Sequence, residues 1–382
     1  MRESCDILII GGGVVGCSVA FHLTQFGRTD VLVVERDFLA SGATGRCGGG
    51  IRAQWSTEGN IKLAQHSIKE FENFKEITGA EIQFRQGGYL LPAYTQEMVE
   101  QFKQNVSLQN KHGVPSRLIS PEEVAEIVPL MNRSEILAAT FCPTDGVANP
   151  FLVTDGYANA ARRKGARFLL RRSVVGFRTS GSRVQTAILD DGTEIDCSLV
   201  LNAAGAWAGE VTKLLGTEIP VTPYRHQILV TEPLEIIHRP MVIDLYHNIY
   251  FSQSEEGGFI TGQTDEDEKP SFNMMNSWRF VVEISRKLLY HYPCLRKVNV
   301  LRQWAGLYAV TPDAQPILGR VNEYENFFCA TGWSGHGFMI SPAVGKIMAE
   351  LFVFGRPKTL SIEEYSIERF KKGEFIREKS VV

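Results

Sequence analysis

The chain has 382 residues, and because a domain typically holds about 100–200 residues, this length predicts two or three domains. Hydrophobic residues make up 44% and charged residues 22%, close to the averages of soluble globular proteins, which excludes a disordered or low-complexity chain. Lys and Arg number 40 against 43 Asp and Glu, so the formal net charge of −3 provides no positive field to attract nucleic acid. We therefore expect small molecules or proteins as partners.

The seven cysteines are widely spread and form no C-x-x-C pair, so we expect buried, reduced thiols and no metal site. No apolar run reaches the roughly 18 residues that a transmembrane segment requires. The first residues lead directly into Ile7–Ile10, which leaves no room for a cleavable signal. We therefore expect a cytoplasmic protein without a transmembrane segment.

The chain begins with the pattern of a β-α-β unit. Ile7–Ile10 is an apolar run followed by glycines, which predicts a strand buried on both faces of a parallel sheet. The helical spacing of Val15, Val19, Ala20 and Leu23 predicts a helix, and Gly27 is placed to end it. The apolar run Val31–Val34 predicts the next strand.

The sequence after the first strand, G-G-G-V-V-G, satisfies the dinucleotide fingerprint G-x-G-x-x-G in the required context. Gly11 permits a tight turn, Gly13 lets the backbone approach a pyrophosphate at the helix N-terminus, and Gly16 allows close packing of helix on strand. Glu35 ends the second strand, where its carboxylate can accept hydrogen bonds from a ribose diol. The fingerprint does not separate FAD from NAD, and we interpret Arg36 as facing solvent or the pyrophosphate rather than an NADP phosphate.

Residues 37–57 are rich in Gly, Ser and Thr and predict a loop. The other predicted helices cover residues 60–75, 95–112, 152–164, 276–289 and 343–354. The other predicted strands cover residues 87–91, 167–171, 174–178, 184–189, 199–201, 227–231, 248–252, 258–261, 298–304 and 326–330. Residues 218–310 alternate like an antiparallel sheet and predict a second domain inserted into the first. The charged stretches 265–268 and 369–372 are expected to be solvated.

Three later segments decide between the cofactors. They are L-V-L-N-A-A-G-A-W from Leu199, the segment that begins W-A-G-L-Y-A-V-T-P-D at Trp304 and ends in P-I-L-G-R from Pro316, and G-W-S-G-H-G-F from Gly332. Together they resemble the FAD-dependent family of D-amino-acid oxidase, glycine oxidase and sarcosine oxidase. Within this family, the chain is most similar to the β subunits of heteromeric sarcosine oxidase and dye-linked L-proline dehydrogenase. That similarity rests on R-C-G-G-G-I-R from Arg46, Y-R-H-Q from Tyr224, I-Y-F-S-Q from Ile249 and S-G-H-G-F-M from Ser334.

The resemblance implies an α/β fold in which an FAD-binding Rossmann-like domain carries an inserted substrate domain with a mixed or antiparallel sheet. We expect the FAD-binding domain over residues 1–85, 145–217 and 311–382, and the substrate-binding domain over residues 86–144 and 218–310. The implied reaction moves a hydride from the carbon next to the amine of L-proline, sarcosine or a similar small amino acid to flavin N5, which gives an imine.

Three residues are expected to act on the substrate. Arg52 matches a family arginine that holds the substrate carboxylate, a task suited to the bidentate guanidinium. Tyr250 either offers a hydroxyl to the substrate or packs between sheets, and His336 lies where the family's G-H-G backbone approaches the pyrimidine end of the flavin. The expected cofactor-binding residues are Gly11, Gly13, Val14, Val15, Gly16, Glu35, Arg36, Ser41, Ala43, Thr44, Arg46, Cys47, Gly48, Gly49, Val174, Val175, Ala204, Gly205, Trp207, Gly306, Tyr308, Gly335, His336, Gly337, Phe338 and Met339.

The chain departs from its relatives at the positions that attach flavin covalently. Gly306 stands where monomeric sarcosine oxidases have a cysteine, and residues 146–150 lack the histidine that binds FMN in heterotetrameric sarcosine oxidases. We therefore expect non-covalent FAD, and any FMN would also be non-covalent, between this chain and a partner.

Two further departures bear on the substrate and on the electron acceptor. Tyr308 and Met339 replace cations that bind carboxylate in glycine oxidases and monomeric sarcosine oxidases, which leaves this task to Arg52. Ile260 replaces an oxygen-reactive lysine and favours a dehydrogenase. Our leading hypothesis is the catalytic β subunit of a heteromeric dehydrogenase whose α subunit carries the electron acceptor. The alternatives are a stand-alone glycine or D-amino-acid-type oxidase that produces hydrogen peroxide, and a non-catalytic flavin electron-transfer subunit.

Overall fold

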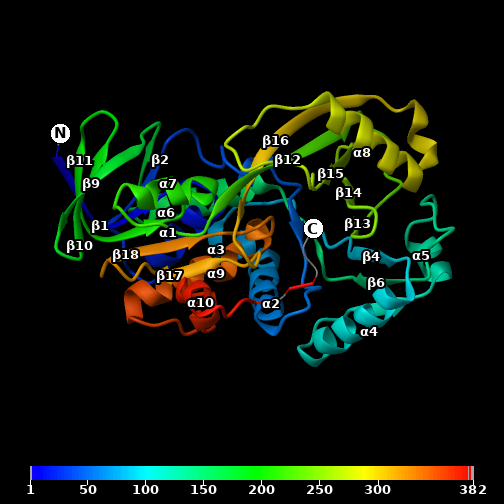
Figure 1. Ribbon diagram of the computed structural model, residues 1–382, viewed down its shortest axis with the longest axis horizontal. Helices are drawn as coiled ribbons and strands as arrows, with labels where there is room; N and C mark the ends of the chain where they lie inside the picture. The colour runs from blue at the N-terminus through cyan, green and yellow to red at the C-terminus, as the bar shows by residue number, and fades with distance from the viewer. Residues whose placement is uncertain (1, 377, 380–382) are drawn as a thin grey trace.

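The computed structural model describes residues 2–376, 378 and 379, and its strands form two large sheets that lie side by side (Figure 1). The first sheet has the order β17-β18-β11-β1-β2-β8, with a hairpin of β9 and β10 attached to β11. Its strands are β1 (Arg2–Ile10), β2 (Val31–Glu35), β8 (Arg167–Leu170), β9 (Val174–Ser180), β10 (Arg183–Leu189), β11 (Glu194–Asn202), β17 (Ile317–Arg320) and β18 (Phe327–Thr331). The predicted parallel β-α-β unit is confirmed, because β1 pairs in parallel with both β2 and β11.

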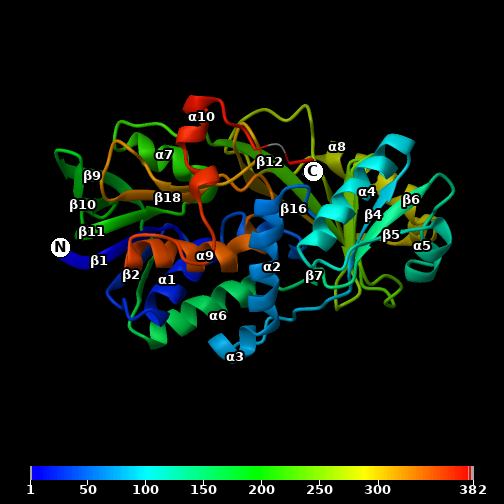
Figure 2. The same cartoon turned by 90° about the horizontal axis from the view of Figure 1, so that it is seen from below.

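The apolar residues of β1 are buried on both faces of this sheet. Ile7 and Ile9 pack against the helices, while Leu8 and Ile10 pack against the layer that contains the β9–β10 hairpin. The helical layer consists of α1 (Val14–Gln25), α2 (Glu58–Glu72), α6 (Pro150–Arg163) and α9 (Gly337–Phe354), as Figure 2 shows. This double burial explains why the strand is a continuous apolar run instead of an alternating one.

The last long helix, α9, begins six residues before its predicted start at Ala343. Pro342 lies inside the helix and lacks the N–H that would bond the carbonyl of Phe338. The Ser341 hydroxyl donates to that carbonyl instead, at 2.8 Å. This substitution of a side-chain donor for a backbone donor lets the helix continue through the proline.

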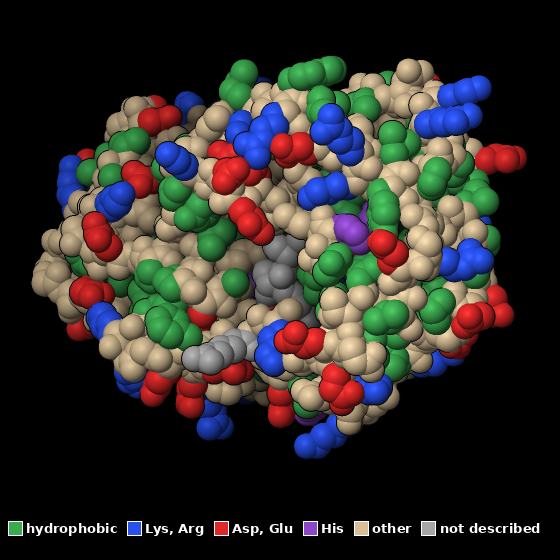
Figure 3. Space-filling model, turned by 45° about the vertical axis from the view of Figure 1, so that its right-hand side comes forward, with side chains coloured by type: hydrophobic (Ala, Val, Ile, Leu, Met, Phe, Trp, Pro, Cys, Tyr) green, Lys and Arg blue, Asp and Glu red, His purple; other side chains and the backbone are tan. Residues whose placement is uncertain are grey.

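The α9 helix is also long and apolar enough to cross a membrane by length and composition, although Lys346 and Glu350 interrupt its apolar sequence. However, 72% of it is buried inside the protein, where it packs against α1 and α2. Such burial is typical of a core helix. On the face shown in Figure 3, basic and acidic side chains are interspersed, in agreement with the near-neutral charge.

The second sheet is mixed and has the order β16-β12-β15-β14-β13-β4-β6-β5. Its pairings are antiparallel except that β13 pairs with β4 in parallel. Helix α8 (Trp278–His291) covers one face, and the other face turns toward the first sheet and α9. The strands are β4 (Tyr89–Ala93), β5 (Arg117–Ile119), β6 (Ala138–Cys142), β12 (Thr222–Thr231), β13 (Met241–Asp244), β14 (Ile249–Gln253), β15 (Phe259–Gln263) and β16 (Val300–Val310).

Every strand of the second sheet lies within residues 86–144 and 218–310, although the domain boundaries themselves stay a prediction. Several short elements were not predicted, because each has too few residues to show a period. They are β3 (Gly50–Ile51), β5, β6, β7 (Gly146–Val147), β13, β17, α3 (Phe74–Thr78), α5 (Pro121–Ile127), α7 (Ala208–Lys213) and α10 (Glu368–Lys372). Helix α4 (Gln96–Lys111) was predicted and is confirmed.

The expectation that residues 369–372 are solvated is wrong for Arg369. Its side chain is only 2% exposed, and its guanidinium donates to both carboxylate oxygens of Asp313, at 2.7 and 2.9 Å. The partner lies 56 positions earlier in the sequence, so a local charge pattern could not reveal the pair. The acidic stretch 265–268 is mainly exposed, but Glu268 accepts a hydrogen bond from Arg225 Nε at 2.9 Å.

We predict that Arg369→Leu lowers the free energy of unfolding by about 3–5 kcal/mol, because it leaves the buried Asp313 carboxylate without its cation. Lys371→Ala is the matched control, since Lys371 belongs to the same helix but its side chain is 61% exposed. Urea unfolding of both variants measures the difference. Equal destabilisation by the two substitutions would contradict a structural role for the pair.

Candidate functional site

Two adjoining cavities lie between the sheets. The larger, of about 470 Å³, follows the carboxyl ends of β1 and β2 and the N-terminus of α1. Nineteen of the predicted cofactor residues line it, namely Gly11, Gly13, Val14, Val15, Glu35, Arg36, Ser41, Ala43, Thr44, Cys47, Val174, Val175, Ala204, Gly205, Trp207, Tyr308, Gly335, Gly337 and Phe338. The carboxyl edge of a parallel sheet is where open α/β folds bind nucleotides.

The glycine-rich turn shapes the end of this cavity. Gly11 adopts a φ of +115°, which disfavours a residue with a side chain, and its N–H donates to Val34 O at 2.9 Å. A Cβ on Gly16 would lie 2.0 Å from Gly11 O, and Gly16 lines neither cavity, so its role is the close packing predicted for it. Gly13 caps α1 without a side chain and the first turn holds no acid, which leaves the positive end of the helix facing the cavity.

Glu35 occupies the position expected of a ribose-binding acid. Its Oε2 accepts the Gly12 N–H at 2.7 Å and its Oε1 accepts the Asp37 N–H at 2.9 Å. A carboxylate oxygen can accept a second hydrogen bond, so these contacts orient the group without saturating it. The neighbouring Arg36 is exposed and lies 3.6 Å over the Trp207 ring, on the wall of the same cavity.

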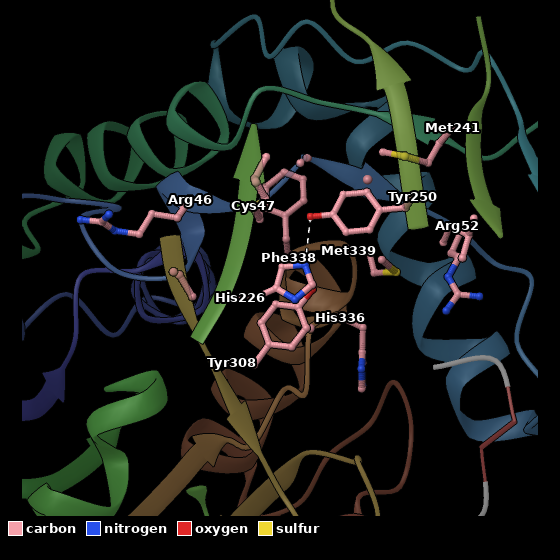
Figure 4. Close-up of a pocket in the computed structure, with 18 of the residues that line it drawn as sticks. Arg46, Cys47, Arg52, His226, Met241, Tyr250, Tyr308, His336, Phe338 and Met339 are labelled. Atoms are coloured by element: carbon pink, nitrogen blue, oxygen red, sulfur yellow. Dashed lines mark hydrogen bonds between the residues drawn. The ribbon is translucent and has the colours of Figure 1, made fainter. Parts of the chain in front are cut away.

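The smaller cavity, of about 110 Å³, lies between the loop after η1 (Thr44–Arg46), the second sheet and the start of α9 (Figure 4). It contains the remaining predicted residues, Arg46, Gly48, Gly49, Arg52, Tyr250, Gly306, His336 and Met339. Six residues line both cavities, namely Ala43, Cys47, Leu307, Tyr308, Gly335 and Phe338. A cofactor in the larger cavity would therefore present one end to a ligand in the smaller one.

Arg52 follows β3 directly and is only 3% exposed. Its Nη1 donates to Gln54 O at 2.9 Å, and its guanidinium lies 3.9 Å over the ring of Trp55. Burial lowers the pKa of this guanidinium, and the charges of Tyr89, Glu378 and Asp145 oppose the shift. An arginine stays protonated in proteins, so the structure holds a positive charge at the wall of a small cavity.

The C-terminal segment also approaches this region. Glu378 accepts hydrogen bonds from the Ser56 N–H at 2.9 Å and the Thr57 hydroxyl at 2.8 Å, at the N-terminus of α2. Sequence reasoning missed this contact because it joins residues more than three hundred positions apart. The C-terminal segment thereby fixes the loop that carries Arg52 at the point where this loop enters α2.

A stack of three rings forms another wall. The His226 ring lies parallel to Tyr308 at 4.3 Å and to Tyr250 at 5.7 Å, and its Nε2 is 3.2 Å from the Tyr250 hydroxyl (Figure 4). Burial lowers the pKa of His226 to about 4 and raises that of Tyr250 well above its ordinary value. Both side chains are therefore neutral near pH 7.

His336 precedes α9 and is 3% exposed, with its ring edge against Trp55. Burial and the nearby charge of Arg52 lower its pKa to about 4. Within the described residues neither ring nitrogen makes a hydrogen bond of good geometry. Buried polar atoms are ordinarily satisfied, so these nitrogens point to a ligand that completes the site.

Cys47 lines both cavities, and the neighbouring Arg46 lines the smaller one. Arg46 Nη1 donates to Ala305 O at 2.9 Å, and Trp304 Nε1 donates to Arg46 O at 3.0 Å, which ties this loop to β16. Burial raises the pKa of Cys47 to about 11, so the thiol stays protonated and is a poor nucleophile toward a flavin.

Sequence reasoning missed several residues of the smaller cavity, namely Trp55, Tyr89, His226, Ile228, Met241 and Ile243. Strand alternation along β12 places His226 and Ile228 on one face, and this signal was available. Met241 and Ile243 lie on β13, which was not predicted. Ile260, in contrast, lines neither cavity.

The family described as "DAO: FAD dependent oxidoreductase" matches residues 6–351. The chain belongs to this family. It is an FAD-dependent oxidoreductase, and the cavity along the glycine turn, with its carboxylate and its open helix N-terminus, fits the adenosine and pyrophosphate of FAD.

Individual relatives extend the comparison. The crystal structure of L-proline dehydrogenase from P. horikoshii is 39% identical, with a TM-score of 0.94, over 98% of this chain and 100% of that one. Sarcosine oxidase subunit beta of Rhodobacter capsulatus is 29% identical over 99% of this chain and 91% of its own length. Mouse dimethylglycine dehydrogenase is also 29% identical, but the chain spans only 43% of it, and it likewise spans 44% of the mouse pyruvate dehydrogenase phosphatase regulatory subunit.

We predict that the protein loses stability as the pH falls from 6.5 to 4, because His226 and His336 gain protons in the unfolded chain before they gain them in the folded one. Each costs on the order of 3 kcal/mol at the acidic end, since one pKa unit corresponds to about 1.4 kcal/mol. Urea midpoints across this range measure the slope. His226→Gln should flatten it, and an unchanged slope would contradict the buried neutral state.

Proposed function

We propose that the protein oxidises L-proline, sarcosine or a similar small amino acid at the carbon next to the amine. In this proposal the chain is the catalytic β subunit of a heteromeric dehydrogenase. The observation that carries this proposal is the buried Arg52 guanidinium on the wall of the small cavity that adjoins the cofactor cavity. The similarity to L-proline dehydrogenase and to sarcosine oxidase subunit beta supports the substrate class.

FAD, when bound, accepts the hydride that the substrate carbon loses. The chain's own residues bind and orient both molecules. Gly11, Gly13 and Glu35 would hold the dinucleotide part, and the backbone around Gly335 and Gly337, at the N-terminus of α9, would hold the ring end. The dipole of α9 favours negative charge there, which is the charge that a flavin ring gains on reduction.

Arg52 would bind the substrate carboxylate through two parallel N–H donors. This bidentate contact would fix the orientation of the carboxylate and neutralise its charge. The apolar side chains of Ile228, Met241 and Ile243 exclude water from the other wall. The small volume of the cavity favours a substrate with a short or cyclic side chain. Orientation of this kind brings the reacting carbon close to its acceptor.

The neutral side chains of His336 and Tyr250 can accept hydrogen bonds from the substrate amine. His336 has ring nitrogens that can accept a hydrogen bond from the substrate nitrogen, and its low pKa keeps it unprotonated for this role at neutral pH. The Tyr250 hydroxyl can donate to His226 Nε2 and accept from the substrate N–H at the same time. A neutral amine gives up hydride more readily than an ammonium, so retention of these groups in neutral form suits the reaction.

The proposed function also includes a partner α subunit and a second flavin, FMN. The similarity to sarcosine oxidase subunit beta supports a partner subunit, whereas Ile260, which lines neither cavity, gives no evidence on the electron acceptor. An FMN held without a covalent bond between this chain and an α subunit would be one acceptor. Flavin analysis of the purified complex tests this point, since it should release FAD and FMN in equal amounts.

We predict that the FAD-loaded chain, mixed anaerobically with L-proline or sarcosine, loses its oxidised flavin absorbance, whereas D-alanine has no effect. Admission of air should restore the absorbance slowly. Rapid reoxidation with peroxide release would instead establish the oxidase alternative. Retention of oxidised flavin with every amino acid would favour a non-catalytic electron-transfer subunit.

We predict that Arg52→Gln lowers kcat/KM for L-proline by roughly 100-fold or more, because loss of a buried charged partner costs about 3–5 kcal/mol. Pyrrolidine is the matched control substrate, since it has the same ring without a carboxylate. Its slow reduction of the flavin should change little in the variant. An equal loss with both substrates would show that Arg52 maintains the fold rather than binds the carboxylate.

A further inference from the structure

A second group of polar side chains lies in the other sheet, outside both cavities. Asp244 ends β13, His247 lies in the turn that leads to β14, and His291 ends α8, on the right of Figure 1. None of the three lines the cofactor or substrate cavity. Elements distant in sequence thus bring a carboxylate and two imidazoles to one point.

The ligand atoms of this group converge. Asp244 Oδ2 lies 2.7 Å from His247 Nδ1 and 3.3 Å from His291 Nε2, and all three atoms lie within 4.8 Å of one another. A zinc ion holds nitrogen and oxygen ligands at about 2.0–2.2 Å, so its ligands lie about 3 to 3.6 Å apart around it. Small side-chain rotations bring the three atoms to that spacing.

The ring nitrogens of His291 are not satisfied by hydrogen bonds from the described residues. Its side chain and that of Asp244 are both 0% exposed. Within the described residues, neither ring nitrogen of His291 makes a hydrogen bond, although Nε2 is directed toward the carboxylate. A buried imidazole without a partner is costly, and a bound cation would remove that cost.

We propose that Asp244, His247 and His291 bind a divalent transition-metal ion of the zinc class. Two imidazoles and one carboxylate form a ligand set that such ions favour over magnesium or calcium, which prefer oxygen alone. The side chain of His247 is 24% exposed, which gives the ion a path from solvent and a position for a water ligand.

Tyr94 supports the site from outside. Its hydroxyl donates to Asp244 Oδ2 at 2.6 Å. Such a hydrogen bond orients a metal-ligating carboxylate. Tyr94 is therefore a positioning residue rather than a ligand.

The ion would connect the β13–β14 turn to the end of α8. Ile243, next to Asp244, lines the substrate cavity and is paired with Tyr250 on β14. The role that follows is structural, since the ion would fix the strand ends behind the substrate cavity without contacting substrate. Binding of the ion at this site does not depend on which substrate the protein oxidises.

The test uses the full chain without a polyhistidine tag, stripped by a chelator and then equilibrated with Zn²⁺ or Co²⁺. We expect one tightly held zinc per chain by elemental analysis, visible d–d absorption with Co²⁺, and a higher melting temperature in the zinc-loaded protein. His291→Ala should abolish all three signals, and Tyr94→Phe should weaken zinc binding roughly 10- to 100-fold.

Two controls separate this site from unspecific binding. His66→Gln changes an exposed histidine outside the group, and Cys294→Ser removes an exposed thiol that can itself bind zinc. Both should keep the full zinc content. Wild-type protein that holds no more zinc than folded Asp244→Asn would overturn the proposal, and so would loss of the zinc in Cys294→Ser.

Discussion

The buried positive charge of Arg52 is the constraint on which the rest of the site depends. A guanidinium at 3% exposure has lost most of its hydration, and the cost of that loss has to be offset by anions and by hydrogen-bond acceptors. Gln54 O and the Trp55 ring supply part of the compensation, and the carboxylates of Asp145 and Glu378 supply part of the field. Under the proposed function, a substrate carboxylate would bind within this field, and its attraction to Arg52 would favour amino acids over simple amines.

The same constraint acts on the titratable groups around Arg52. Burial raises the pKa of Asp145 to about 6, so this carboxyl is still mostly ionised at pH 7 and supports the guanidinium, and it lowers the pKa of His336 to about 4, so this imidazole is neutral there. The ring stack of Tyr308, His226 and Tyr250 likewise holds no charge near neutral pH. The smaller cavity is therefore lined by the buried Arg52 guanidinium and by Arg46, and the attraction of a buried cation for a carboxylate is greater in this low-dielectric space than in water.

Much of the fold could be predicted because its strongest signals are local. The β-α-β unit, its glycine turn and the alternation of β14 and β15 are each visible within short windows, and the strands and helices appear close to the expected positions. The motifs at Arg46, Trp304 and Gly332 also identified most of the cavity walls, because they resemble known family segments. Sequence reasoning failed where the deciding contact is distant, as for Arg369 with Asp313 and for Glu378 at the start of α2. It also failed at β13, too short to show a period, although two of its residues line the smaller cavity.

The most direct test of the proposed site is a crystal structure of the FAD-loaded protein with tetrahydrofuran-2-carboxylate, which keeps the ring and carboxylate of proline but lacks the oxidisable amine. We predict that its carboxylate accepts two hydrogen bonds from Arg52 and that its ring lies in the small cavity between His226 and the flavin. A carboxylate bound elsewhere, with Arg52 retaining only its contacts within the chain, would contradict the assignment of this cavity as the substrate site.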